Sequence, residues 1–162
     1  MGFAIGINPT NPSATAQTDG NGFSPGDVIQ DYAGNTWVYV KASAAIAQYD
    51  VVTYDETFIT TVAPVSTSND ARGDKLGVAA AAFEADDYGF LQIYGPCTVN
   101  VLASCNANAE LTITATGGSL DDATTASLMV ADGIVLTAAN SASVAAAKAG
   151  ILNWPVVGRT LT

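Results

Sequence analysis

The feature of this sequence that most restricts its fold is the alternation of residues in short runs separated by turns. The stretch "NTWVYVKASAAIAQYDVVTYDE" (35–56) alternates on both sides of one Gln-Tyr-Asp turn. Alternate side chains of an extended strand point to opposite faces, so Trp37 and Tyr39 share one face and Val38 and Val40 the other. A strand that is apolar on both faces is expected to be covered on both.

Further strands are predicted along the rest of the chain. "DVIQDYAGNTWVYV" predicts a hairpin, and "YGFLQIYGPCTVNVLAS" is the strongest strand signal. In "ELTITATGG", the alternation predicts that Leu111, Ile113 and Ala115 point inward and the threonines outward. The alanine-rich segment 141–148 is the one place where two helical turns are predicted. We therefore expect an all-β chain in which residues 27–162 form a compact β-barrel or β-sandwich body.

An internal repeat is indicated by two pairs of similar segments. "VKASAA" begins at Val40 and "VLASCN" at Val101, while "YGFLQIYGP" begins at Tyr88 and "AGILNWPVV" at Ala149. Both pairs are separated by the same 61 positions. This offset predicts two similar β-modules, near 40–95 and 101–156, packed into one body.

Residues 1–26 differ in composition from the rest of the chain. They are mainly Gly, Asn, Pro, Thr and Ser, with few large apolar residues. Such a segment cannot form a core of its own, so we expect an extended N-terminal arm that becomes ordered against a neighbour. Phe3, Ile5 and Ile7 would lie on one face of a short strand and are predicted to bind a partner.

The composition excludes several classes of function. The chain has no histidine, which removes the commonest general base and metal ligand. Its net charge of −10 opposes nucleic-acid binding, and no apolar run is long enough to cross a membrane. Cys97 and Cys105 would be too far apart for a disulfide if one strand joins them, so two buried free thiols, suited to a reducing cytoplasm, are expected.

Three adjacent carboxylate pairs are the remaining candidates for chemistry, namely Asp55 with Glu56, Asp86 with Asp87, and Asp121 with Asp122. A glycosidase needs two carboxylates across a cleft, and calcium binds such groups weakly. Each pair flanks a predicted strand beside turn residues, so solvated turns are the preferred interpretation. The "RGD" at 72–74 is interpreted as an exposed loop. We predict no catalytic residue, no cofactor site and no metal site.

Three stretches, which cover most of residues 23–138, together resemble the small β-rich decoration, or cement, proteins of tailed-bacteriophage heads. They are "GNTWVYVKASAAIAQYDVVTYDE", "KLGVAAAAFEADDYGFLQIYGPCTVNVLA" and "GIVLTAANS". In that group a "YVKA" strand leads into an "A-x-x-Gly-Asp-x-Val" turn, a "Gly-Val-Ala" strand, an acidic turn and a glycine-led strand. These features fall here at Tyr39–Ala42, Tyr49–Val52, Gly77–Ala79 and Asp86–Tyr94. One departure is Tyr49, which stands where such proteins often have glycine, so the exact geometry of that turn is open.

The resemblance implies a protein without enzymatic activity on the outer surface of a virion capsid, made in the host cytoplasm. Its partner would be the major capsid protein, it would form a homotrimer, and it would stabilise the head by bridging capsomers. Two other classes stay open. One is a secreted carbohydrate-binding or adhesion module, for which exposed aromatics would speak, and the other is a different virion component such as a tail or fibre subunit.

Overall fold

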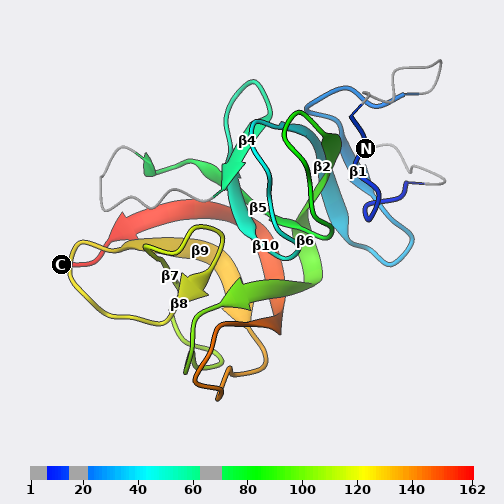
Figure 1. Cartoon of the computed structure of the whole chain (residues 1–162). Helices are drawn as coiled ribbons and strands as arrows, with labels where there is room; N and C mark the ends of the chain where they lie inside the picture. The colour runs from blue at the N-terminus through cyan, green and yellow to red at the C-terminus, as the bar shows by residue number, and fades with distance from the viewer. Residues whose placement is uncertain (1–6, 15–21, 63–70) are drawn as a thin grey trace.

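The computed structural model describes residues 7–14, 22–62 and 71–162, and within them the chain forms ten β-strands (Figure 1). They are β1 (Val28–Gln30), β2 (Thr36–Ala42), β3 (Val51–Tyr54), β4 (Ile59–Val62), β5 (Lys75–Ala79), β6 (Tyr88–Val101), β7 (Thr112–Ile113), β8 (Leu120–Asp121), β9 (Met129–Leu136) and β10 (Ala146–Thr160). The all-β fold class predicted from the sequence is confirmed. None of the described residues forms a helix of the length and hydrophobicity that crossing a membrane requires.

Five strands pair in a closed ring that we call the first barrel. β2 pairs with β6, β6 with β5, β5 with β3 and β3 with β4, all antiparallel. β4 then closes the ring by pairing in parallel with β2. Closure leaves these five strands without a free edge within the ring.

A second ring, the second barrel, repeats this pattern and shares β6 with the first. The C-terminal half of β6 pairs with β10, β10 with β9, β9 with β7 and β7 with β8. β8 closes the ring by pairing in parallel with β6, through Val101 and Leu120. β1 to β5 lie in one half of the molecule and β7 to β9 in the other, and the two long strands β6 and β10 join the halves (Figure 1).

The two segments that suggested a repeat occupy equivalent strands of the two rings. Leu91 of β6 and Leu152 of β10 are 61 positions apart, and both are fully buried. Glycine precedes each of them by two positions because the backbone approaches a neighbour closely there. A Cβ on Gly89 would lie 2.7 Å from the Phe83 ring, and one on Gly150 would lie 2.8 Å from the Val135 carbonyl oxygen.

One apolar core fills the first barrel, a second joins the second barrel to Val51, Leu76 and Val78 of β3 and β5, and a third cluster covers the outside of the first barrel. The first core includes Val38, Val40 and Leu91, which point into the first ring. Trp37 and Tyr39 point the other way, as the alternation predicted, and both are buried. β2 is therefore covered on both faces.

Two local predictions are wrong. Residues 141–148 form no helix, because β10 begins at Ala146 and pairs with β6 from that residue onward. Pairing with a neighbouring strand overrides the helix propensity of alanine. Thr112 and Thr114 are buried and Ala115 is exposed, whereas the alternation placed them the other way round. The two threonine hydroxyls tolerate burial because they donate to backbone carbonyls.

Candidate functional site

Three turns share one construction, in which an aspartate closes the turn and leads into a strand. Asp27, Asp50 and Asp87 each donate their backbone N–H to the carbonyl three residues earlier, at 2.9, 3.2 and 3.2 Å. The carboxylate of each also accepts the N–H of that earlier residue, at 2.8, 3.0 and 2.8 Å. The carboxylates thus satisfy turn N–H groups that no strand partner reaches.

The residue before each of these aspartates has a left-handed backbone. The φ angles are 101° at Gly26, 69° at Tyr49 and 70° at Asp86. Tyr49 therefore adopts the conformation that glycine adopts in the first of the three turns, which settles the turn geometry left open by the sequence. A tyrosine in this region carries strain of about 1–2 kcal/mol.

The turn at Asp50 also joins the two barrels. The Asp50 carboxylate accepts the side-chain amide of Asn100 at 2.9 Å, and Asn100 donates its backbone N–H to the Tyr49 carbonyl at 2.9 Å. Val51 donates its N–H to the carbonyl of Gly118 at 2.8 Å. Asn100 lies on β6 and Gly118 precedes β8, so this buried carboxylate fixes the second barrel against the first.

The pair Asp55 and Glu56 borders an open groove of about 530 Å³, which Asp74 and Lys75 also line. Asp55 accepts hydrogen bonds from the Thr57 hydroxyl at 2.7 Å and from the backbone N–H groups of Thr57 and Ile59. The hydrogen bond from the Thr57 hydroxyl lowers the pKa of Asp55, and the bonds from the backbone N–H groups act in the same direction. Desolvation acts to raise this pKa but is outweighed. The lowered pKa keeps Asp55 ionised at neutral pH, so Asp55 is unsuited to the proton-donating role of a glycosidase carboxyl group.

The pair Asp86 and Asp87 is engaged in two different ways. Asp86 forms an ion pair with Lys41 at 2.7 Å, and this hydrogen-bonded partner raises the pKa of the lysine. Asp87 closes the turn described above. Both side chains therefore hold the turn that leads into β6.

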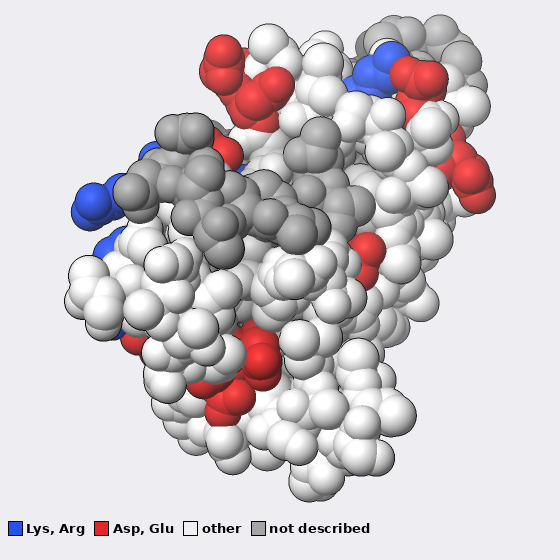
Figure 2. All heavy atoms as spheres, turned by 60° about the vertical axis from the view of Figure 1, so that its left-hand side comes forward, with Lys and Arg blue, Asp and Glu red and all other residues white. Residues whose placement is uncertain are grey.

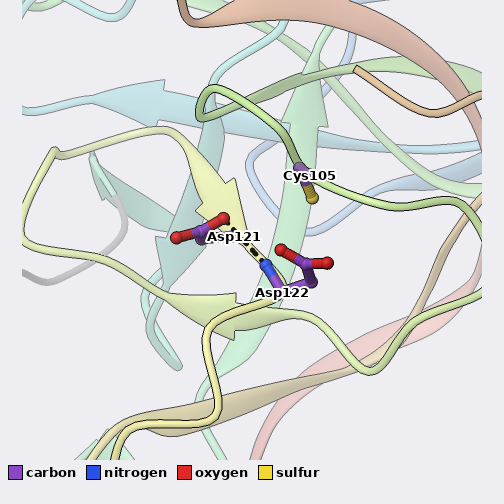
Figure 3. A group of neighbouring side chains, drawn as sticks. All are labelled: Cys105, Asp121 and Asp122. Carbon is purple, nitrogen blue, oxygen red and sulfur yellow. Dashed lines mark hydrogen bonds between the residues drawn. The ribbon is translucent and has the colours of Figure 1, made fainter. Parts of the chain in front are cut away.

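The pair Asp121 and Asp122 lies beside Cys105, with the thiol and carboxylate atoms within 4.8 Å of one another (Figure 3). Burial and the two carboxylates raise the pKa of the Cys105 thiol to about 11, so the thiol keeps its proton at neutral pH. Asp122 accepts the side-chain amide of Asn106 at 2.6 Å and its backbone N–H at 3.1 Å.

Through these hydrogen bonds, Asp122 holds the loop that contains Asn106 against the segment that follows β8. Burial alone would raise the pKa of Asp122, but the hydrogen bonds from Asn106 lower it overall. Asp121, by contrast, has its pKa raised by burial, although its side chain accepts the N–H of Asp122 at 3.0 Å. Cys97 is also a free thiol, and burial raises its pKa to about 11.

The predicted partner-binding residues of the arm are only partly within the described residues. Phe3 and Ile5 lie outside them. Ile7 is partly buried and packs on the chain's own outer cluster, together with Phe23. The ring of Phe23 lies 5.0 Å from that of Phe90, centroid to centroid, in an edge-to-face arrangement. This part of the arm therefore contacts the first barrel.

Aromatic side chains divide into a buried and an exposed group. Trp37, Tyr39 and Phe90 are buried and cannot stack on a sugar. Trp154 is half exposed, with a φ of 50°, and lies where the pairing of β10 with β9 shifts register. It borders a mostly apolar hollow of about 190 Å³, which Val28 and Phe58 also line.

The second barrel presents an exposed stretch of sheet with seven uncharged side chains, and the exposed Asp132 lies farther along β9. Direct strand partners share a face, and Ile151 of β10 is opposite both Pro96 of β6 and Val135 of β9. Asn153 is opposite Tyr94, and Ala149 is opposite Thr98. We call these seven residues the neutral face.

Exposure of the neutral face is high for apolar side chains in a sheet. Tyr94 is 41% exposed, Val135 44% and Ile151 48%. On the side of the molecule drawn in Figure 2, acidic groups are scattered and separated by uncharged areas. The shared offset of 61 positions aligns β6 with β10, but only the strand register shows that Pro96, Val135 and Ile151 are adjacent.

No protein-family model matches this chain, and no curated protein or solved structure is significantly similar to it.

Proposed function

We propose that this protein is a non-enzymatic structural component of a tailed-phage virion. It binds the outer surface of the head, contacts the major capsid protein and stabilises the shell by bridging capsomers. On this proposal it is made in the host cytoplasm, forms a homotrimer and needs no cofactor.

The observation that carries the proposal is the use to which the acidic side chains are put. Asp27, Asp50 and Asp87 close turns, Asp55 closes another, and Asp122 ties two loops together. Each of these carboxylates is occupied by hydrogen bonds that hold backbone in place. This arrangement suits a protein whose task is to keep its shape under load.

The stretches that resemble decoration proteins also support the proposal through their positions. "YVKA" lies at the end of β2, the Tyr49–Val52 turn leads into β3, and Gly77–Ala79 ends β5. Asp86–Tyr94 forms the turn into β6 and its first half. These four features thus fall on consecutive parts of the first barrel, and the remaining stretch, "GIVLTAANS", begins in β9 of the second barrel.

The physical mechanism would be additional buried area across the joints between capsomers. Each joint that the protein spans must lose this contact before the capsomers separate, which raises the free energy of separation. The net charge of −10 keeps the free protein soluble and opposes binding to packaged DNA.

The test is co-sedimentation of the purified chain with DNA-free heads that lack it. We expect saturable binding by the full chain and weaker binding by the double variant Phe3→Ser/Ile5→Ser. This variant leaves Ile7 and its contacts in place, and comparison of its thermal unfolding with that of the parent establishes that it has folded. Failure of the full chain to bind at any concentration would contradict the proposal.

The carbohydrate-binding module is kept as a second candidate because of Trp154. Its half-exposed indole beside an apolar hollow is the arrangement that stacks on a sugar ring. Titration of the protein with a glycan library, followed by tryptophan fluorescence, would detect it. The Trp154→Ala variant distinguishes this signal from that of buried Trp37, since only Trp154 is accessible to a ligand.

A further inference from the structure

Two cavities of the first barrel meet at shared side chains. The open groove of about 530 Å³ and the mostly apolar hollow of about 190 Å³ are both lined by Tyr54, Phe58 and Lys75. The hollow is also lined by fully buried strand residues, namely Val38, Leu76 and Ile93. It therefore reaches the apolar interior of the barrel, and the groove continues from it. We call the two cavities together the composite site.

Tyr54 lines both cavities and carries a polar group that the fold leaves unpaired. The residue is 8% exposed, and within the part of the chain that the structure describes its hydroxyl has no hydrogen-bond partner. The hydroxyl is not sealed inside the protein, since among the described residues only Thr60 has a fully enclosed side-chain oxygen without a partner. It therefore opens onto the composite site, where a ligand can supply the partner that a group at this depth normally has.

The Tyr54 hydroxyl is held in position and stays protonated. Its ring stacks on that of Phe58, with 6.1 Å between the centroids and 22° between the planes. Its backbone pairs with Lys75 of β5. Burial raises the pKa of Tyr54 to about 12, so at neutral pH the hydroxyl can donate a hydrogen bond. A fixed neutral donor of this kind suits a carbonyl oxygen.

The hollow is the size of one side chain. Pockets that enclose a whole small-molecule ligand measure about 300–1,000 Å³, and this hollow of about 190 Å³ is smaller. Trp154 borders it, half exposed, with a left-handed φ of 50° that costs a bulky residue backbone strain. Strained residues of this kind gather where ligands are held. An exposed indole beside such a hollow fits the insertion of a single apolar anchor residue.

The groove carries the charges that the hollow lacks. Its charged residues are Asp55, Glu56 and Asp74 on the acidic side and Lys75 on the basic side. Glu56 and Asp74 are exposed, and neither forms an ion pair with another described residue. The backbone of Asp74 is fixed, because its carbonyl accepts the N–H of Val157 at 2.8 Å. The excess of negative charge is complementary to a cationic group.

We propose that the composite site binds an extended segment of a partner polypeptide, with a large apolar side chain in the hollow and a basic side chain next to it in the groove. The apolar side chain packs on Trp154 and Phe58. The basic side chain pairs with Glu56 and Asp74, and the Tyr54 hydroxyl donates to a carbonyl of the segment. The groove is open, as a chain that continues beyond the site requires. The proposal concerns the free protein and does not depend on binding to a phage head.

The test uses the two tryptophans of the chain as reporters. Trp154 borders the site, whereas the indole N–H of Trp37 is bonded to Asp31 at 3.0 Å and serves as an internal reference. Nuclear magnetic resonance of the isotope-labelled full chain records both indole signals, and Trp154→Ala assigns them. Acetyl-Lys-Phe-Lys-amide, added up to about 10 mM, should shift the Trp154 signal in a saturable way and leave that of Trp37 in place.

Two matched peptides separate the contribution of charge from that of the apolar side chain. Acetyl-Glu-Phe-Glu-amide keeps the phenyl ring and reverses the charge, while acetyl-Lys-Ser-Lys-amide keeps the charge and removes the ring. Each should bind at least about 10-fold more weakly than acetyl-Lys-Phe-Lys-amide. Added salt should weaken binding of the basic peptide, because its ion pairs lie in an open groove.

Variants of the chain identify the groups that bind. Tyr54→Phe keeps the ring and should weaken binding by about 3- to 10-fold. It should leave thermal unfolding close to that of the parent, because the hydroxyl has no partner among the described residues of the free chain. Glu56→Gln should weaken binding by about 3-fold. Glu84→Gln is its matched control, since Glu84 is exposed and lines neither cavity, so the same loss of charge should leave the affinity unchanged.

Three outcomes would overturn the proposal. The first is a Trp154 signal that does not move with acetyl-Lys-Phe-Lys-amide at about 10 mM. The second is equal binding of the acidic peptide or of the serine peptide, because the site would then select neither charge nor an apolar side chain. The third is unchanged affinity in both Tyr54→Phe and Glu56→Gln. Since no heads are present in this experiment, its failure would leave the proposed function to the co-sedimentation test.

Discussion

The first and second barrels have the same strand pairings, but they differ in how far their outward-facing side chains are buried. Leu91 and Leu152 occupy equivalent inward positions, and both are fully buried. Phe90 and Ile151 occupy equivalent outward positions, and they are 3% and 48% exposed. Closure of a small ring thus dictates the inward residues in both barrels, whereas the outward residues depend on what packs over them.

A second difference lies in the turns that lead into strands. In the first barrel, the turns before β3 and β6 are closed by Asp50 and Asp87. The turn before β9 in the second barrel has the same positive φ, 76° at Ser127, and the same backbone bond from Leu128 to Thr125. Leu128 has no carboxylate, so that turn lacks the side-chain bond.

The largest expected effect comes from truncating the two equivalent outward residues. Phe90→Ala should destabilise the protein by about 3–5 kcal/mol, because it removes a buried ring that packs on Tyr39 and Phe23. Ile151→Ala should change the stability of the free chain by about 0.5 kcal/mol or less. Urea unfolding at low protein concentration, with both variants compared with the parent, measures the difference.

Equal losses of stability in Phe90→Ala and Ile151→Ala would contradict this difference between the barrels. They would mean that Ile151 is buried in the free chain, and the neutral face would then not exist as a surface. Dependence of the Ile151→Ala effect on protein concentration would instead reflect association, since a bound partner stabilises the folded state. Measurement at two concentrations separates these cases.

An effect of intermediate size is expected from the acid sensitivity of the β1–β2 hairpin. Asp31 closes the β1–β2 hairpin by accepting the indole N–H of Trp37 and the side-chain amide of Asn35, both at 3.0 Å. Burial alone would raise its pKa, but these bonds and those from the backbone of Asn35 and Ala33 lower it below the ordinary value of 3.8. The hairpin contributes Ile29 and Trp37 to the apolar cluster on the outside of the first barrel.

A carboxylate with a lowered pKa stabilises the folded state above its unfolded pKa and loses that effect as the pH falls through its folded pKa. Asp31→Asn should therefore cost about 1 kcal/mol at neutral pH, in the range of a turn or cap bond at a partly exposed site. The difference between variant and parent should shrink as the pH falls below about 4. Thermal unfolding from neutral to acidic pH measures it, and a constant difference would show that Asp31 acts by packing alone.

Local alternation allowed much of the fold to be predicted, because it reports directly on strand faces. It placed Trp37 and Tyr39 opposite Val38 and Val40, and the shared offset aligned β6 with β10, which occupy corresponding places in the two rings of strands. It failed at 141–148, where pairing with β6 outweighs the propensity of alanine. It also could not reveal the neutral face, since that surface arises from the register of three strands that are distant in sequence.

The smallest effect is expected at Tyr49 and Asn108, two residues with a left-handed backbone conformation in corresponding turns of the two barrels. Tyr49, with φ 69°, donates its N–H to the carbonyl of Ala79 at the end of β5, and Asn108, with φ 57°, donates to that of Leu136 at the end of β9. Asparagine tolerates this conformation better than tyrosine does, because its short side chain can bond locally. The second barrel thus has the less strained residue at this position.

Exchange of the two residues tests this difference. Tyr49→Asn should stabilise the protein by about 0.5–1 kcal/mol, and Asn108→Tyr should destabilise it by a similar amount. Because Tyr49 is partly exposed, the loss of its ring contacts should not cancel the gain. Chemical unfolding of both variants measures the two changes. A loss of stability in Tyr49→Asn would mean that the tyrosine ring contributes more by packing at the joint between the barrels than its backbone costs in strain.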